Sequence, residues 1–229
     1  MLRRLAPLTA LCAGLLLAAT ASALSLSDLS QADASGGLKD ALAQGAQVAV
    51  KQLGTPGGFN NNPQVRIQLP AKLEKANKLL SGLGMGSQVQ ELENGMNTAA
   101  EAAVPQAQAI LVNAVKNMTV TDAKGILSGG NDSATQYLNK TSREDIRSKF
   151  LPIVKANTDK IGLAQRFNSV AGQASALGGL NAKTNTVEGY VTEKALDGLF
   201  KMIAQQEETI RKNPAAAASG LAKKVFGSL

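Results

Sequence analysis

Apolar residues recur at every third or fourth position along most of this chain, the spacing that gathers them on one face of an α-helix. One long stretch places Leu196, Leu199, Phe200, Ile203 and Ile210 on a single side. The pattern predicts an all-α, multi-helix bundle, with helices near residues 38–53, 70–83, 87–103, 107–115, 120–127, 141–154, 163–177 and 187–212 and a short alanine-rich helix from Pro214.

Local start and stop signals refine these helices. Three pairs fit the capping-box pattern, which joins a hydroxyl residue to an acidic or amide residue three places later. These pairs are Ser87 with Gln90, Thr119 with Asp122, and Thr141 with Glu144. Asp159 is expected to cap the start of the helix that follows it. Pro105 and Pro152 are expected to kink or interrupt their helices, because proline lacks the N–H group that the helix needs.

Residues 57–70, GGFNNNPQVRIQLP, do not fit the helical pattern. Near residues 64–69 apolar side chains such as Val65 and Ile67 alternate with polar ones, which predicts one short extended or β segment with its apolar side on the helices. A lone strand leaves backbone groups unpaired. Three arrangements are therefore open to this segment. It could pair with a short strand at 118–120, pair with its copy across a homodimer axis, or leave its backbone in water. We favour the first.

The N-terminus has the layout of a secretory signal peptide. Arg3 and Arg4 precede an apolar run that ends in the small residues ASA. We predict a signal peptide over residues 1–23, cleaved after Ala23, and a helical domain over residues 24–229. The apolar run is shorter than the ~20 residues that a membrane-spanning helix needs. No membrane span is therefore expected after cleavage.

The composition narrows the chemistry open to this domain. The chain has no histidine and no tryptophan, and its one cysteine, Cys12, lies within the predicted signal peptide. Ser-His and Cys-His nucleophile pairs and the usual zinc sites are therefore excluded, and we expect no cofactor and no metal. The net charge of +7 is scattered and aromatic residues are few, so we expect no nucleic-acid partner.

Four stretches of the sequence together carry a family resemblance. They are GGFNNNPQVRIQLP, MTVTDAKGILSGGNDSATQYL, FLPIVKANTDKIGLAQRFNSVAG and YVTEKALDGLFKMIAQQEETIRKNP. In this order they resemble a family of uncharacterised proteins of Gram-negative bacteria, catalogued as a domain of unknown function. The resemblance implies an exported helical protein, and with the predicted signal peptide it gives a periplasmic location. It implies no activity, cofactor or catalytic residue.

Charged pairs on the predicted helix at 187–212 are candidates for binding a ligand or partner. Glu193 and Asp197 are four positions apart, so their carboxylates repel each other and need a cation. Lys194, an arginine of another helix or a metal could supply it, and we favour a side chain. Glu207 and Arg211 have the spacing of a helical salt bridge, which we expect on a solvated face.

Three further binding candidates lie elsewhere in the pattern. Arg66 is expected on the solvent side of the extended segment, where a fixed positive charge could meet an anionic group. Tyr137 and Tyr190 are expected to bury their rings and to direct their hydroxyl groups at polar partners. We assign no residue to catalysis.

These observations give one leading hypothesis of function and two alternatives. The leading one is a periplasmic, non-catalytic helical binding or scaffolding module for a hydrophobic small molecule or an envelope protein, with Gly57 and Gly58 as a hinge. The alternative is a hydrolase or lyase that uses Glu193, Asp197 and Glu207. A homodimer formed through the extended segment is the third hypothesis.

Overall fold

The computed structural model describes residues 30–70, 86–160, 162 and 186–229, and every regular element in these ranges is a helix. This confirms the predicted all-α class. The α-helices are α1 (Gln31–Leu53), α3 (Gly86–Ala103), α4 (Ala107–Lys116), α5 (Val120–Leu127), α6 (Ser133–Lys160), α8 (Val187–Lys212) and α9 (Gly220–Phe226). Two short 3₁₀ turns, η3 (Val104–Gln106) and η4 (Pro214–Ala216), lie between them.

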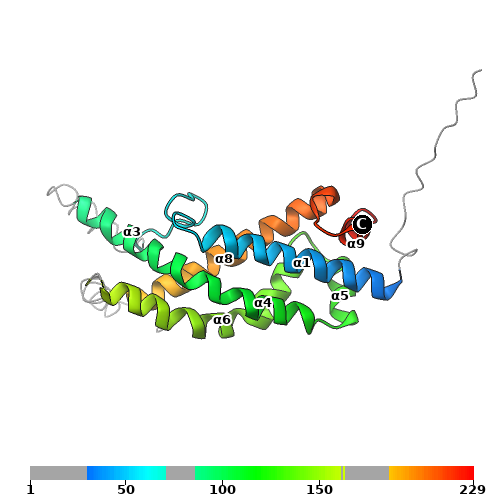
Figure 1. Cartoon of the computed structure of the whole chain (residues 1–229), viewed down its shortest axis with the longest axis horizontal. Helices are drawn as coiled ribbons and strands as arrows, with labels where there is room; N and C mark the ends of the chain where they lie inside the picture. The colour runs from blue at the N-terminus through cyan, green and yellow to red at the C-terminus, as the bar shows by residue number, and fades with distance from the viewer. Residues whose placement is uncertain (1–29, 71–85, 161, 163–185) are drawn as a thin grey trace, which may run out of the picture.

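The helices form an elongated bundle (Figure 1). α3 and α4 follow each other along one long rod, with α1 on one side of it and α6 on the other (Figure 1). α6 packs against α8 and α3, while α1 packs against α8, α4 and α9. The small helix α9 lies at the end of the bundle where α1 begins (Figure 1). Each long helix is therefore covered by neighbours on more than one side.

The core lies between α1, α3, α6 and α8. Leu38, Phe150 and Leu196 are completely buried in it. Phe59 and Ile67, which belong to the non-helical residues after α1, are as deeply buried as the helical side chains. None of the described helices is both long enough and apolar enough to cross a membrane.

Small residues allow α9 to approach α1 closely. A Cβ atom added at Gly37 would lie 2.6 Å from Val225 and 2.8 Å from the backbone oxygen of Leu221. Glycine at the contact therefore sets the spacing of these two helices.

α1 itself begins earlier than the predicted start at residue 38, because Ser30 caps it by accepting a 3.0 Å hydrogen bond from the Asp33 N–H.

The predicted capping signals had mixed outcomes. Thr119 and Asp122 form the predicted box, with reciprocal hydrogen bonds of 3.1 and 2.9 Å. Ser87 lies one residue inside α3, so the helix starts close to the predicted place. Two predictions were wrong: Thr141 lies within α6, where its hydroxyl donates to the Tyr137 carbonyl, and Asp159 lies near the end of the same helix. A hydroxyl that bonds to its own preceding turn has the same local sequence pattern as a cap.

The prolines separate elements as their geometry requires. Pro105 lies in η3 and divides α3 from α4, as predicted. Pro152 lies within α6 without ending it. Pro214 opens a 3₁₀ turn instead of the predicted final helix, which begins later, after the Ser219 cap. The predicted helix at 163–177, and all but the first residue of the one at 70–83, lie outside the described residues.

Candidate functional site

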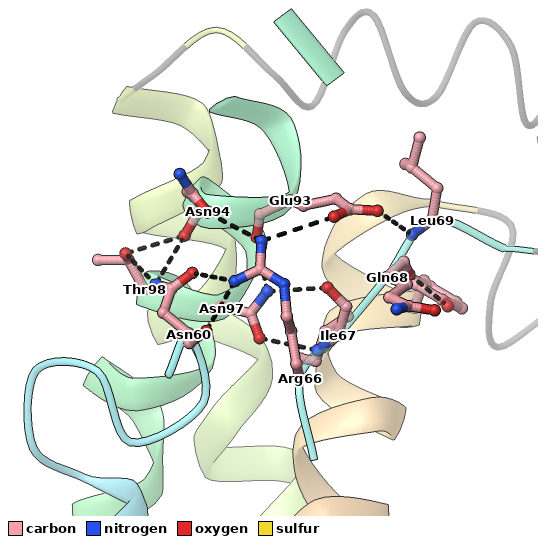
Figure 2. Close-up of polar contacts among 10 residues, drawn as sticks. Asn60, Arg66, Ile67, Gln68, Leu69, Glu93, Asn94, Asn97 and Thr98 are labelled. Atoms are coloured by element: carbon pink, nitrogen blue, oxygen red, sulfur yellow. Dashed lines mark hydrogen bonds and ion pairs between the residues drawn. The ribbon is translucent and has the colours of Figure 1, made fainter. Parts of the chain in front are cut away.

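The chain leaves α1 through a tight turn that depends on glycine. Gly57 has a φ of 86°, in the left-handed region that favours glycine. A Cβ atom at Gly58 would lie 2.4 Å from the Gln52 carbonyl oxygen, so any other residue would clash with α1. After this turn residues 66–70 run extended between α3 and α8 (Figure 2).

Side chains of α3 pair with the backbone of this extended segment. The carboxamide of Asn97 accepts from the Ile67 N–H and donates to the Ile67 carbonyl, both at 2.8 Å (Figure 2). Glu93 accepts from the Leu69 N–H at 3.1 Å. Glu101 accepts from the N–H groups of Phe59 and Asn60, each at 3.0 Å. Asn97, with no exposed surface, therefore does what a neighbouring strand would do.

The arrangements predicted for this segment are corrected by these bonds. Pairing with residues 118–120 was wrong, because Thr119 caps α5 and Val120 is already helical. A backbone left wholly in water was also wrong, since Ile67 is buried and both of its backbone groups are bonded. Pairing across a dimer axis stays a prediction. The apolar side covers the helices as expected, with Val65 and Ile67 in the core.

Arg66 is tied to α3 and to the preceding turn, and the anionic group beside it belongs to this chain. Its guanidinium donates to the Asn60 carbonyl at 2.7 Å and to Asn94 Oδ1 at 3.0 Å (Figure 2). Glu93 lies 3.6 Å from the same group. Arg66 thus fastens the segment in place.

α8 holds the other side of the segment. The Tyr190 hydroxyl donates to the Gln68 carbonyl at 2.8 Å, and Lys201 Nζ donates to the Gln64 carbonyl at 3.0 Å. Burial raises the pKa of Tyr190 to about 12, and the negative charges of Glu93 and Asp197 add to the effect. The Tyr190 hydroxyl therefore remains a protonated donor, which agrees with its predicted polar partner.

A glycine of α8 lets the segment lie against this helix. A Cβ atom at Gly198 would lie 2.8 Å from the Phe59 ring and 3.3 Å from Val65. With glycine there, both apolar side chains reach the core while the polar edge of the segment faces the helix surface. The close approach thus depends on the absence of a side chain at this position.

A groove of about 340 Å³ remains open between the segment and α8. Two lysines, Lys194 and Lys201, lie on its α8 wall. Lys194 Nζ is 5.9 Å from the centre of the Tyr190 ring and 3.8 Å from Asp197. The groove lining is Gln64, Val65, Arg66, Ile67, Gln68, Leu69, Tyr190, Lys194, Asp197, Gly198 and Lys201.

The cation that Glu193 and Asp197 need comes from α6. Arg143 Nη2 lies 2.9 Å from Glu193 and 2.8 Å from Asp197, and Arg147 also pairs with Glu193. Of the three cations offered from the sequence, the arginine of another helix binds both carboxylates, and Lys194 pairs with Asp197 alone at 3.8 Å. Across the part of the chain that the structure describes, no cluster of three acidic, histidine or cysteine side chains could hold a metal ion. Asp197 lines the groove, whereas Glu193 joins α8 to α6.

Glu207 and Arg211 form the predicted salt bridge, at 2.9 Å, but in a different setting. Both side chains are almost fully buried instead of solvated, with side-chain exposures of 2% and 10%. Glu207 accepts from the N–H groups of Ala134 and Thr135 at the start of α6, and Arg211 donates to the Ile126 carbonyl at the end of α5. The pair therefore joins three helices.

The three carboxylates of the enzyme hypothesis do not meet in one cleft. Glu193 and Glu207 lie on the same helix, roughly four turns or about 21 Å apart. Tyr137 lies at a different cavity of about 290 Å³, between α4 and α6, beside Asn113 and Asp145. Burial raises the pKa of Tyr137, and the charge of Asp122 adds to this. Arg66, Tyr190 and Asp197 are thus the sequence candidates that share the groove.

Sequence reasoning missed the residues of α3 that pair with the segment. Glu93, Asn97 and Glu101 are spaced at four-residue intervals, so they form one polar row along a helix. Asn97 and Glu101 lie on a face that is otherwise filled by Met96 and Ala100. Such a polar row beside a buried stripe was the available signal, because buried polar groups require partners.

Comparison with known proteins identifies a family whose function is unknown. A family model described as "Protein of unknown function (DUF4197)" matches residues 28–227. No curated protein and no solved structure matches the chain.

Proposed function

We propose, for a chain that belongs to this DUF4197 family of proteins of unknown function, that it is a non-catalytic binding module acting in the periplasm. The export part of the proposal is supported by the basic start, apolar run and small-residue cleavage motif of residues 1–23. The binding part is supported by the groove between the extended segment and α8. Its ligand carries an anionic group.

The observation that carries the proposal is a rigidly held segment beside an open groove. Asn97 and Arg66 tie the segment to α3, and Tyr190 ties it to α8. Glu101 and Lys201 hold the residues just before it, at Phe59 and Gln64. Binding to a surface that is already ordered avoids the free-energy cost of ordering it on association. Side chains of α3 and α8 make these hydrogen bonds to the backbone of the segment. A helical bundle could pack its apolar core without holding a non-helical segment in one fixed conformation.

The charges on the groove define the class of ligand. The Lys201 ammonium makes one backbone bond and has three N–H donors, so it can also bind a ligand oxygen. Asp197, the nearest acid to Lys194, is bound more closely by Arg143. Two ammonium groups on one wall favour a carboxylate or another anion. The purely hydrophobic ligand of the sequence hypothesis fits this lining less well.

The enzyme alternative lacks comparable support. Glu193 and Asp197 are occupied by arginines of α6, and Glu207 is buried at the joint of α5, α6 and α8. A hydrolase or lyase of the expected kind needs its carboxylates around one substrate. The geometry therefore favours binding.

The test is native mass spectrometry of protein extracted mildly from the periplasm. We expect a co-purifying ligand on the wild type and on the control variant Lys223→Gln/Lys224→Gln, whose changes lie on an exposed part of α9. The groove variant Lys194→Gln/Lys201→Gln should bind about tenfold more weakly, a change of ~1.4 kcal/mol, and at ligand concentrations below Kd it should carry about tenfold less ligand. A wild type that is repeatedly empty, or equal occupancy in all three proteins, would contradict the proposal.

A further inference from the structure

We infer that the ligand of the groove is an extended, acidic peptide segment of a partner protein, which adds as a strand to the free edge of residues 66–68. This inference rests on the proposed function, since it names the occupant of the same groove. It adds the mode of recognition, which is backbone pairing supported by charge.

The free edge follows from the alternation of an extended backbone. N–H and C=O groups of successive residues point to opposite sides of a strand. The backbone groups of Ile67 and the N–H of Leu69 are directed at α3, where Asn97 and Glu93 bind them. Those of Arg66 and Gln68 consequently point toward α8 and the groove.

Half of the groups on this edge are already bonded. The Arg66 N–H donates to the Asn62 carbonyl at 2.9 Å, and the Gln68 carbonyl accepts from Tyr190. In the described part of the chain no hydrogen bond reaches the Gln68 N–H or the Arg66 carbonyl. Gln68 is exposed, Arg66 is partly exposed, and both residues line the groove, which places these two groups beside the space that a ligand would fill.

The two open groups have the spacing that strand addition requires. They belong to the residues on either side of Ile67. In a parallel pair, one residue of the added strand donates to the carbonyl before the residue it faces and accepts from the N–H after it. Peptides that add to a sheet edge gain affinity from such main-chain bonds and specificity from side chains. Asn97 makes the equivalent bonds on the opposite side of the same segment.

The charge of the groove selects the side chains of the peptide. Lys194 and Lys201 lie two turns apart on α8, about 10 Å along its axis. Side chains on one face of an extended chain recur at every second residue, about 7 Å apart, so acidic residues at alternate positions would all face this wall. The long lysine side chains can then each reach one of these carboxylates.

Charge also argues against a second copy of this chain as the occupant. The chain carries a net charge of +7, and the edge itself carries Arg66. Two copies paired through this edge would bring their lysines and arginines together. An acidic partner is complementary where a second copy is not.

The experiment selects decapeptides from a randomised phage-displayed library on the wild-type protein and then measures amide exchange with the strongest synthetic peptide. We expect enrichment in Asp and Glu. At a peptide concentration of ~10 times Kd the Gln68 amide should exchange about tenfold more slowly, because exchange then occurs only from the free fraction. The Ile67 amide, already bonded to Asn97, is the internal control and should not change. N-methylation of the peptide at the residue facing Ile67 should abolish binding.

Several results would overturn the inference. They are no enrichment over the Lys194→Gln/Lys201→Gln variant, a saturating peptide that leaves Gln68 exchange unchanged, or a peptide-free homodimer in which Gln68 is already protected. The last result would assign the edge to a second copy. If native mass spectrometry still finds an anionic ligand that depends on the two lysines, the proposed function stands and strand addition alone fails. If neither is found, both fail.

Discussion

Asn97 is the residue on which the extended segment most depends. Its carboxamide binds both backbone groups of Ile67 and also donates to the Glu93 carbonyl at 2.7 Å, all without exposure to solvent. A buried amide in this position costs free energy unless its donors and its acceptor are bonded. Asn97 is therefore held in one position, and through its hydrogen bonds it fixes the extended segment.

Replacing Asn97 with leucine tests this dependence. Asn97→Leu keeps an apolar side chain of similar size but leaves the Ile67 N–H and C=O unpaired in the core. We expect a loss of about 2–6 kcal/mol in the free energy of unfolding, at ~1–3 kcal/mol for each of the two orphaned groups. Urea unfolding measures it. The matched control, Asn113→Leu on the exposed side of α4, should stay within ~0.5 kcal/mol of the wild type. Equal losses in the two variants would show that Asn97 has no special importance.

Tyr190 predicts a pH dependence at the alkaline end. The pKa of its hydroxyl is raised to about 12 in the fold, above the value of 10.0 for an unperturbed tyrosine. The folded state therefore holds this proton more tightly than the unfolded chain. Its contribution to stability is complete below pH ~10 and is lost as the pH rises toward 12.

The measurement is urea unfolding as a function of pH with two tyrosine variants. Tyr190→Phe should remove most of the decline between pH ~10 and ~12. Tyr137→Phe should remove less, although burial raises the pKa of Tyr137 too. The assignment to Tyr190 fails if Tyr190→Phe declines as steeply as the wild type.

At the scale of the elements, polar side chains join helices at two places. One is the row Glu93, Asn97 and Glu101 on α3, which holds the segment. The other is the buried pair of Glu207 and Arg211, which connects α8 with the start of α6 and the end of α5. A carboxylate at a helix start also interacts favourably with the helix dipole. These contacts fix how the elements are placed, and apolar packing supplies the bulk of the stability.

The Glu207 pair predicts a large difference between neighbouring glutamates. Glu207→Gln leaves the Arg211 charge buried without its counter-ion, and we expect a loss of about 3–5 kcal/mol in urea unfolding. Glu208→Gln breaks a pair with Lys212 that is largely exposed, so the loss should be under ~1 kcal/mol. Similar losses from the two substitutions would mean that the buried pair is not a structural joint.

The sequence pattern predicts the elements better than their contacts. Periodicity places α8 at 187–212, and the Thr119–Asp122 box places the start of α5, because both signals are local. Thr141 and Asp159 mislead for the same reason, since each sits inside a helix where a local pattern resembles a cap. The extended segment is visible in the sequence. Its partner Asn97 comes from a separate helix, a tertiary choice that local propensity does not encode.

The sequence identifies several residues of the candidate site, but it does not show which of them lie together. Asp197 and Tyr190 reach the groove because α8 presents them on the face that meets the segment. Glu207 and Arg211, roughly three to four turns beyond Asp197 on the same helix, face a different joint. A helix that packs on several neighbours distributes its charged residues among them, and only the packing reveals which of them share a site.

At the scale of the whole molecule, export is the first expectation to check. The signal-peptide layout predicts that the protein recovered from a periplasmic extract begins at Leu24. Its intact mass should be that of residues 24–229, which mass spectrometry determines directly. Substituting Ala23 with a bulky residue such as phenylalanine should block cleavage, because signal peptidase requires small residues there. A mature chain that keeps its first residues, or that stays in the cytoplasm, would contradict a periplasmic function.

The molecule as a whole combines a closed bundle with one fixed, open backbone edge. α3 satisfies one side of the segment through its side chains, and α8 leaves part of the other side free beside two lysines. The binding proposal and the inferred peptide partner both require this asymmetry. Without it the groove would be a shallow surface feature of an ordinary helical bundle.

Amide hydrogen exchange along residues 64–69 of the free protein tests this asymmetry most directly. The Ile67 and Leu69 amides, bonded to Asn97 and Glu93, should be strongly protected and should open only with large-scale unfolding. The Gln68 amide between them should exchange nearly as fast as in an unstructured peptide. Rapid exchange at all three amides, or a protected Gln68 beside an unprotected Ile67, would show that the segment has no such fixed side and open side.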